Sequence, residues 1–141
     1  MNRILVPIDG SASSNHALAT GLQWFKGMPG LKLHVLTVQP PIASGNVKRF
    51  ISADTLKLYY EEEAEKILAP VREQLAGENL DVQFDWRVGH IAETIIEYAK
   101  ETECTHIVMG TRGMGGFSNL LLGSIATKVL SLTNVPVTLV K

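Results

Sequence analysis

The stretch Ile4-Leu5-Val6-Pro7-Ile8-Asp9-Gly10-Ser11 decides the fold of this chain. Its apolar half extends the run Arg3–Ile8, and short runs rich in Ile, Leu and Val are typical of strands buried on both faces. The triplet Asp9-Gly10-Ser11 then supplies a turn together with side chains that can cap a helix. The sequence therefore predicts a buried strand that leads directly into a helix.

The same alternation of strand and helix continues along the chain. Helical spacing of apolar residues begins at Ala17, Tyr60 and Ile91, and each of these stripes is followed by a short apolar run. The remaining predicted elements are the strands Leu31–Val38, Val82–Val88, Thr105–Gly110 and Pro136–Val140 and the helix Ser124–Leu132. This order predicts an α/β fold in a single domain over residues 1–141, an open five-stranded parallel sheet with helices on both faces.

Two segments interrupt this regular pattern. Pro70 lies inside the second helical stripe and predicts a kink or a division of that helix, because proline cannot donate the helical hydrogen bond. The segment Gln39–Ser52 lacks periodicity, and loops of this length inside compact domains are usually functional. We expect it to act as a mobile flap.

The composition excludes several classes of protein. The 141 residues suit one ordinary domain, and 45% hydrophobic with 19% charged residues indicates a globular chain. The formal net charge of −1 offers no basic field for nucleic acid or an anionic membrane. A single cysteine, Cys104, rules out a disulfide framework and suits the cytoplasm. No segment is typical of a signal peptide or a membrane span.

Glycines crowd the connection that follows the fourth predicted strand. Gly110 and Gly113 begin this segment, and Gly123-Ser124 ends it at the start of a helix. Backbone N–H groups at such a helix start bind phosphate, and Arg112 could add a positive charge. The alternative, which spacing alone leaves open, is a flexible surface loop with Ser124 as an ordinary N-cap.

Three parts of the chain carry a shared pattern: Ile4–Ser11, Val108–Gly113 with Gly123-Ser124, and Val135-Pro136-Val137. In these motifs the chain resembles the universal stress protein family, and the resemblance covers its whole length. The nucleotide signature of its ATP-binding branch is Gly, two residues, Gly, nine residues, Gly, then Ser or Thr. Gly110, Gly113, Gly123 and Ser124 match this signature. The resemblance implies a Rossmann-like sheet of strand order 3-2-1-4-5 and the binding of ATP, ADP or AMP, with Mg²⁺ as an optional companion of the phosphates.

The resemblance also implies a role for individual residues. Pro7, Asp9 and the backbone of Val38 correspond to the adenine side of the pocket. The ribose and phosphate side corresponds to Met109, Gly110, Arg112 and Gly113, and the phosphate-binding turn to Gly123, Ser124 and Ile125. Without the resemblance, Asp9 would be interpreted as a helix N-cap and both Met109 and Ile125 as core residues.

Efficient catalysis is not expected from this pocket. A phosphate-binding loop of NTPases places Lys beside its Ser or Thr, whereas Leu122 and Ile125 flank Gly123-Ser124. We therefore predict a stress regulator that holds an adenine nucleotide, with no catalytic or metal-ligating residue. The alternative is a slow ATPase or nucleotide hydrolase in the same pocket. In the family the last strand pairs across a two-fold axis, which implies a homodimer through Val135–Val140.

Overall fold

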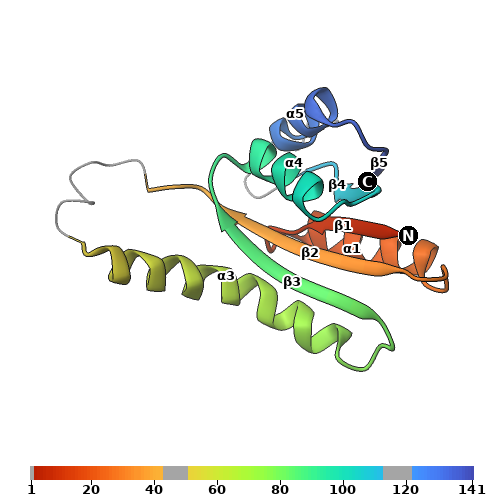
Figure 1. Ribbon diagram of the computed structural model, residues 1–141, viewed down its shortest axis with the longest axis horizontal. Helices are drawn as coiled ribbons and strands as arrows, with labels where there is room; N and C mark the ends of the chain where they lie inside the picture. Colours follow the sequence, from red (N-terminus) through yellow and green to blue (C-terminus); the bar gives the residue numbers. More distant parts are fainter. Residues whose placement is uncertain (1, 43–50, 113–121) are drawn as a thin grey trace.

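Strands and helices alternate strictly in the computed structural model, which describes residues 2–42, 51–112 and 122–141 (Figure 1). The five strands are β1 (Arg3–Pro7), β2 (Lys32–Gln39), β3 (Asp81–Val88), β4 (His106–Gly110) and β5 (Val137–Val140). The helices are α1 (Ala12–Phe25), α3 (Ala53–Leu75), α4 (Ile91–Glu101) and α5 (Ser124–Leu132). The predicted order of elements is confirmed.

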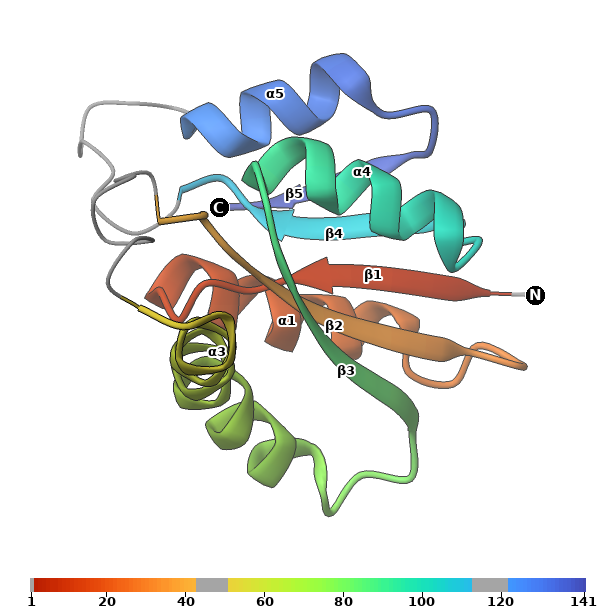
Figure 2. The same cartoon turned by 60° about the vertical axis from the view of Figure 1, so that its left-hand side comes forward.

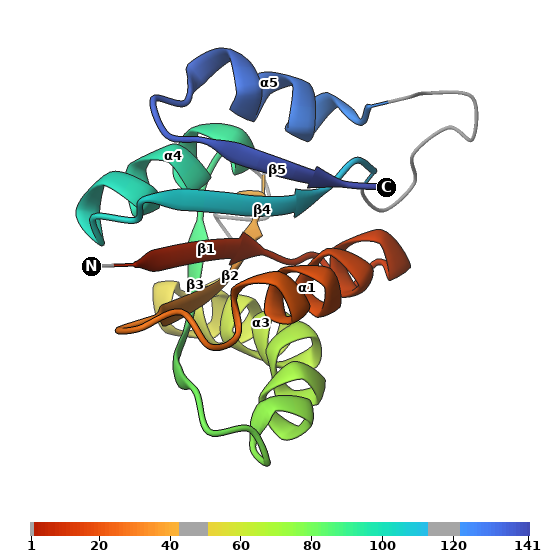
Figure 3. The ribbon, with the colours of Figure 1, turned by 90° about the vertical axis from the view of Figure 1, so that its right-hand side faces the viewer.

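All five strands are parallel and lie in the order β3-β2-β1-β4-β5 (Figure 3). β1 is central, since Leu5 is in register with His34 of β2 on one side and with Ile107 of β4 on the other. The chain therefore winds outward from β1 in one direction and from β4 in the other. This confirms the predicted topology and brings the carboxyl ends of β1 and β4 together where the strand order reverses.

Helices cover both faces of the sheet (Figure 2). One core layer joins α1 and α3 to the sheet through Val6, Val35 and Val108 and their neighbours. The other joins α4 and α5 to the sheet and includes Leu5 and Ile107. Adjacent residues of β1 thus face opposite layers, which explains why its sequence is continuously apolar instead of alternating.

Serine side chains set the beginning of two helices. The Oγ of Ser11 accepts a hydrogen bond from the Ser14 backbone N–H at 3.1 Å, so α1 begins at Ala12, before the apolar stripe. The Oγ of Ser52 accepts from the Thr55 N–H at 3.1 Å and caps α3 in the same way. Capping chemistry, and not the apolar stripe, therefore decides where these helices start.

α3 continues from Ala53 to Leu75 through Pro70, so the helix is not divided there. Pro70 lies on the exposed side, while the buried residues Ala64, Leu68 and Val71 keep packing on both sides of it. The loss of one hydrogen bond is therefore tolerated. Residues 43–50 of the predicted flap lie outside the described residues. None of the described helices combines the length and apolarity required to cross a membrane.

Candidate functional site

An open hollow lies at the carboxyl ends of β1, β2 and β4. The lining residues are Pro7, Ile8, Asp9, Ser14, Val38, Ile91, Ile95, Met109, Gly110, Thr111, Arg112, Gly123, Ile125 and Ala126. They come from three strand ends and from the first turns of α1, α4 and α5, which only the folded sheet brings together.

The turn between β1 and α1 holds Asp9 in a defined position. Its backbone N–H donates to Ser14 Oγ at 3.2 Å, and its Oδ1 accepts from the Ser11 N–H at 2.9 Å. Gly10 has a φ of +84°, a left-handed conformation that side chains disfavour. Ser11, not Asp9, is the N-cap of α1, so the interpretation of Asp9 as a cap is wrong. Asp9 instead orders the turn that forms one wall of the hollow.

Gly110, at the end of β4, packs directly against α1. A Cβ atom added there would lie 2.9 Å from the backbone oxygen of Ser13, closer than real Cβ atoms approach. The Arg112 N–H also donates to Ser13 Oγ at 3.4 Å, and the Thr111 N–H donates to the Val140 carbonyl at 3.1 Å. The first glycine of the signature therefore has a packing role as well as a place in the hollow.

The first turn of α5 presents backbone donors at the edge of the hollow. Gly123 is the N-cap, so the interpretation of Ser124 as an ordinary N-cap is wrong. Within residues 2–42, 51–112 and 122–141, no side chain caps this turn. The Gly123 N–H donates to the Thr111 carbonyl at 2.5 Å, which ties the helix start to the end of β4. A helix start of this kind attracts anions, because its N–H groups carry the positive end of the helix dipole.

The remaining wall of the hollow is mainly apolar. Ile91 and Ile95 of α4 line it together with Val38 of β2. Asp9 and Arg112 are the charged residues among the described lining. Within the described residues, no group of three or more His, Cys, Asp or Glu side chains is placed to hold a metal ion. An apolar slot beside an anion-attracting helix start suits a ligand with a flat apolar part and an anionic part.

Eight of the ten residues predicted for the site line this hollow: Pro7, Asp9, Val38, Met109, Gly110, Arg112, Gly123 and Ile125. Ser124 is the first residue of the adjoining helix α5, and Gly113 lies outside the described residues. Their role in binding stays a prediction. The lining residues that sequence reasoning missed are Ile8, Ser14, Ile91, Ile95, Thr111 and Ala126. The position of Ile91, three residues after Val88 at the carboxyl end of β3, could have indicated that it lines the site.

A second cluster of polar groups lies between α4 and the strands β2 and β3. Tyr98, which is 1% exposed, donates its hydroxyl hydrogen to Asp85 Oδ2, and His34 Nδ1 lies 3.0 Å from the same hydroxyl oxygen. His34 is 3% exposed, and its Nε2 has no partner among the described residues. Burial lowers the pKa of His34 and raises the pKa of Tyr98. Through these contacts His34 and Tyr98 anchor α4 to the sheet.

Cys104 lies on the same side of the sheet and is 5% exposed. Burial raises the pKa of its thiol, while its Sγ lies 3.2 Å from Thr102 Oγ1. The thiolate form is the reactive one, so this cysteine is a core residue and not a nucleophile.

The comparison with known proteins identifies the family. The model of the universal stress protein family matches residues 1–141. The chain belongs to this family. The universal stress protein YxiE of Bacillus subtilis is 29% identical to it over 99% of both chains.

Solved structures show the same architecture. The structure of hypothetical protein MJ0577 covers 99% of this chain and 95% of its own, with 28% identity and a TM-score of 0.86. A universal stress protein in complex with cAMP is 23% identical, with a TM-score of 0.73 and 99% and 97% coverage. Another, from Archaeoglobus fulgidus in complex with dAMP, is 19% identical, with a TM-score of 0.70 and 100% and 98% coverage. At these lower identities the likeness is one of fold.

Proposed function

We propose that the chain binds an adenine nucleotide in the hollow at the carboxyl edge of the sheet and acts as a regulator in stress response. The observation that carries this proposal is that the start of α5, which no described side chain caps, meets an apolar slot at the switch point of the sheet. Ligands of open parallel sheets bind at this place. The backbone N–H groups at the start of α5 attract phosphate, and the apolar slot suits a flat base.

The charge and polarity of the walls predict how the nucleotide lies. The phosphates belong beside Gly123 and Ser124, where backbone N–H groups and Arg112 offset their charge. The base belongs at the other side of the hollow, between Val38 and the side chains of Ile91 and Ile95. Backbone N–H and C=O groups at the end of β2 can then form hydrogen bonds with the edge of the base.

Two family members of the same fold support adenine as the base, since one is solved with cAMP and the other with dAMP. Both ligands carry a single phosphate. The signature residues Gly110, Gly123 and Ser124 resemble the ATP-binding branch, so we extend the proposal to ATP and ADP, with Mg²⁺ as a companion of their phosphates.

Calorimetric titration with ATP, ADP and AMP tests this proposal. We expect saturable binding that Gly123→Val weakens by at least roughly tenfold, because the side chain would occupy the place of a phosphate oxygen. Gly77→Val is the matched control, because a Cβ at Gly77 meets nothing within 4 Å. Absence of binding at millimolar nucleotide, or equal losses in both variants, would contradict the proposal.

Turnover separates a regulator from an enzyme in the same pocket. The lining offers Asp9 as its described carboxylate, with no second carboxylate among the described lining residues to hold a metal ion or activate water. We therefore propose binding without efficient hydrolysis. Steady release of phosphate from ATP over many turnovers, abolished by Gly123→Val, would instead support the slow ATPase.

We further propose that the protein is a cytoplasmic homodimer that pairs through β5. β5 ends the sheet, and its outer edge pairs with no strand in the described part of the chain. Leu130 and Leu132 of the neighbouring α5 are 40% and 42% exposed, an apolar surface beside an open strand edge. Sedimentation at micromolar concentration should show a dimer, and a monomer alone would contradict this proposal.

A further inference from the structure

A second hollow of about 530 Å³ adjoins the proposed nucleotide pocket. It lies between the end of β2, the first turn of α4 and the exposed side of α5, and its lining includes Pro40, Pro41 and His90. Ile91 and Ile125 line both hollows, so the two spaces share these side chains as a common wall. The nucleotide pocket therefore has a neighbouring space that a larger ligand could reach.

The second hollow is lined by both apolar and polar residues. Pro40, Pro41 and Ala92 contribute carbon surface, together with the two shared isoleucines. Among the polar residues, Lys128 Nζ lies 2.5 Å from Glu93 Oε1, so these two charges offset each other. Transfer of apolar groups out of water into such a space is favourable. Its occupant is therefore expected to be apolar and uncharged.

The position of the second hollow relative to the proposed nucleotide indicates which ligand atom faces it. With the phosphates at Gly123, the base lies beside Val38 and Ile91. Pro40 lies two residues after Val38, and His90 lies directly before Ile91. In adenine the exocyclic amine is attached to the six-membered ring, across the base from the bond to ribose. The nucleotide orientation proposed above places that amine on the side of the second hollow.

We propose that the protein accepts adenine nucleotides that carry an alkyl or aryl group on the exocyclic amine, and that this group lies in the second hollow. This inference rests on the proposed function, because it requires the nucleotide orientation given above. Ile91 then contacts the base from the first hollow and the added group from the second, and Ile125 also lines both hollows. The amine keeps one hydrogen when it carries one substituent, so its donor capacity toward the backbone at the end of β2 is preserved.

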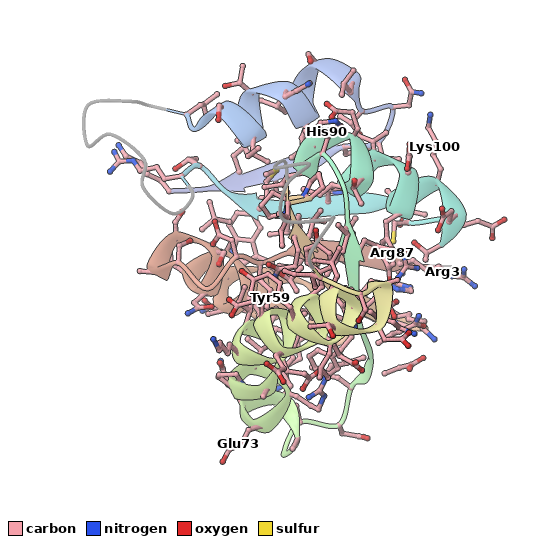
Figure 4. The ribbon with its side chains drawn as sticks, turned by 90° about the vertical axis from the view of Figure 1, so that its left-hand side faces the viewer. Arg3, Tyr59, Glu73, Arg87, His90 and Lys100 are labelled. Atoms are coloured by element: carbon pink, nitrogen blue, oxygen red, sulfur yellow. The ribbon has the colours of Figure 1, made fainter. Side chains whose placement is uncertain are left out.

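Filling the second hollow provides the test. His90 is exposed at the N-terminal end of α4, opposite to the end that carries Lys100, and its side chain makes no capping hydrogen bond (Figure 4). His90→Trp places an indole in the second hollow from the α4 side, and Pro41→Trp does so from the β2 side. His16→Trp adds the same indole at an exposed position of α1 that lines neither hollow.

Calorimetric titration with ADP and N6-benzyl-ADP compares the four proteins. We expect the unchanged protein to bind N6-benzyl-ADP at least as tightly as ADP, because the phenyl group is buried against apolar side chains. At least one filled variant should lose roughly tenfold or more in affinity for N6-benzyl-ADP while ADP affinity stays within about threefold. His16→Trp should change neither affinity.

The outcomes separate this inference from the proposed function. If ADP binds and N6-benzyl-ADP binds more than roughly tenfold more weakly to the unchanged protein, the second hollow does not receive the group. Equal affinity ratios in all four proteins would overturn the inference in the same way, since the group would then lie elsewhere. Failure of ADP itself to bind would overturn the proposed function and this inference with it.

Discussion

Acidification should destabilise this protein through His34. The imidazole is 3% exposed on β2, where its Nδ1 lies 3.0 Å from the Tyr98 hydroxyl oxygen. Tyr98 gives its own hydrogen to Asp85, so His34 Nδ1 carries the hydrogen that the tyrosine oxygen accepts. Nε2 then holds a lone pair, and no described group faces it as a partner. A second proton at Nε2 would be buried without an acceptor.

The surrounding charges lower the pKa of His34 further. Burial is the largest cause, and Lys32 and Arg3 add repulsion that Asp85 and Asp81 only partly offset. The Arg87 guanidinium lies over the Tyr98 ring, and the buried Cys104 thiol is a further titratable group near Tyr98. Below the ordinary pKa of 6.5 the unfolded chain therefore binds a proton that the folded chain excludes.

The sign and size of the effect follow from this difference in protonation. The stabilisation is present above pH 6.5 and is lost as the pH falls from there toward the lowered pKa of the folded state. One excluded proton costs at most about 1.4 kcal/mol of unfolding free energy between about pH 7.5 and pH 5.5. Burial also lowers the pKa of His106. The contribution of His106 to the loss of stability on acidification stays the same when only His34 is changed.

Urea unfolding at both pH values measures the effect. His34→Leu should lose less stability on acidification than the unchanged protein, by up to about 1.4 kcal/mol, because the leucine binds no proton in either state. His16→Leu is the control, since His16 is exposed on α1. For each protein, the free energy of unfolding is compared between the two pH values. A loss of stability that the substitution causes at both pH values therefore cancels. An identical pH effect in all three proteins would refute the reasoning.

Three further predictions concern stability and are checked by urea unfolding at neutral pH. Tyr98→Phe should cost about 1–3 kcal/mol, because it leaves the His34 Nδ1–H buried without an acceptor, and a change below about 0.5 kcal/mol would contradict this. Gly110→Ala should cost about 1–3 kcal/mol through its clash with α1, while Gly77→Ala should stay within about 0.5 kcal/mol. Ser11→Ala should cost about 1 kcal/mol as a lost N-cap, and an unchanged unfolding midpoint would exclude that role.

Most of the fold could be predicted from local patterns. Short apolar runs alternate with helical stripes, and this alternation alone predicts parallel strands with helices on both faces. Element boundaries were harder to predict, because they depend on single hydrogen bonds such as the one between Ser11 and Ser14. Of the kink or division predicted at Pro70, the division does not occur, since buried packing on both sides of Pro70 keeps α3 continuous.

The candidate site could be predicted only where residues lie in a recognisable motif. The glycine signature and the strand ends led to Asp9 and Gly110, and both line the hollow. Ile91 and Ile95 resemble any other apolar residues of a helical stripe, so nothing local indicates that they face a ligand. Their position depends on how α4 packs against β2, a contact between segments distant in the sequence.

The sequence by itself determined the class of the fold, its family and the position of the glycine signature, because each of these depends on residues close together in the chain. Only the tertiary structure decided what Gly110 contacts, why His34 stays neutral and where the second hollow adjoins the first. Each of these depends on the packing of groups from different elements. Such packing arises when strands β1, β2 and β4 align their carboxyl ends, and no local pattern of residues specifies the distances that result.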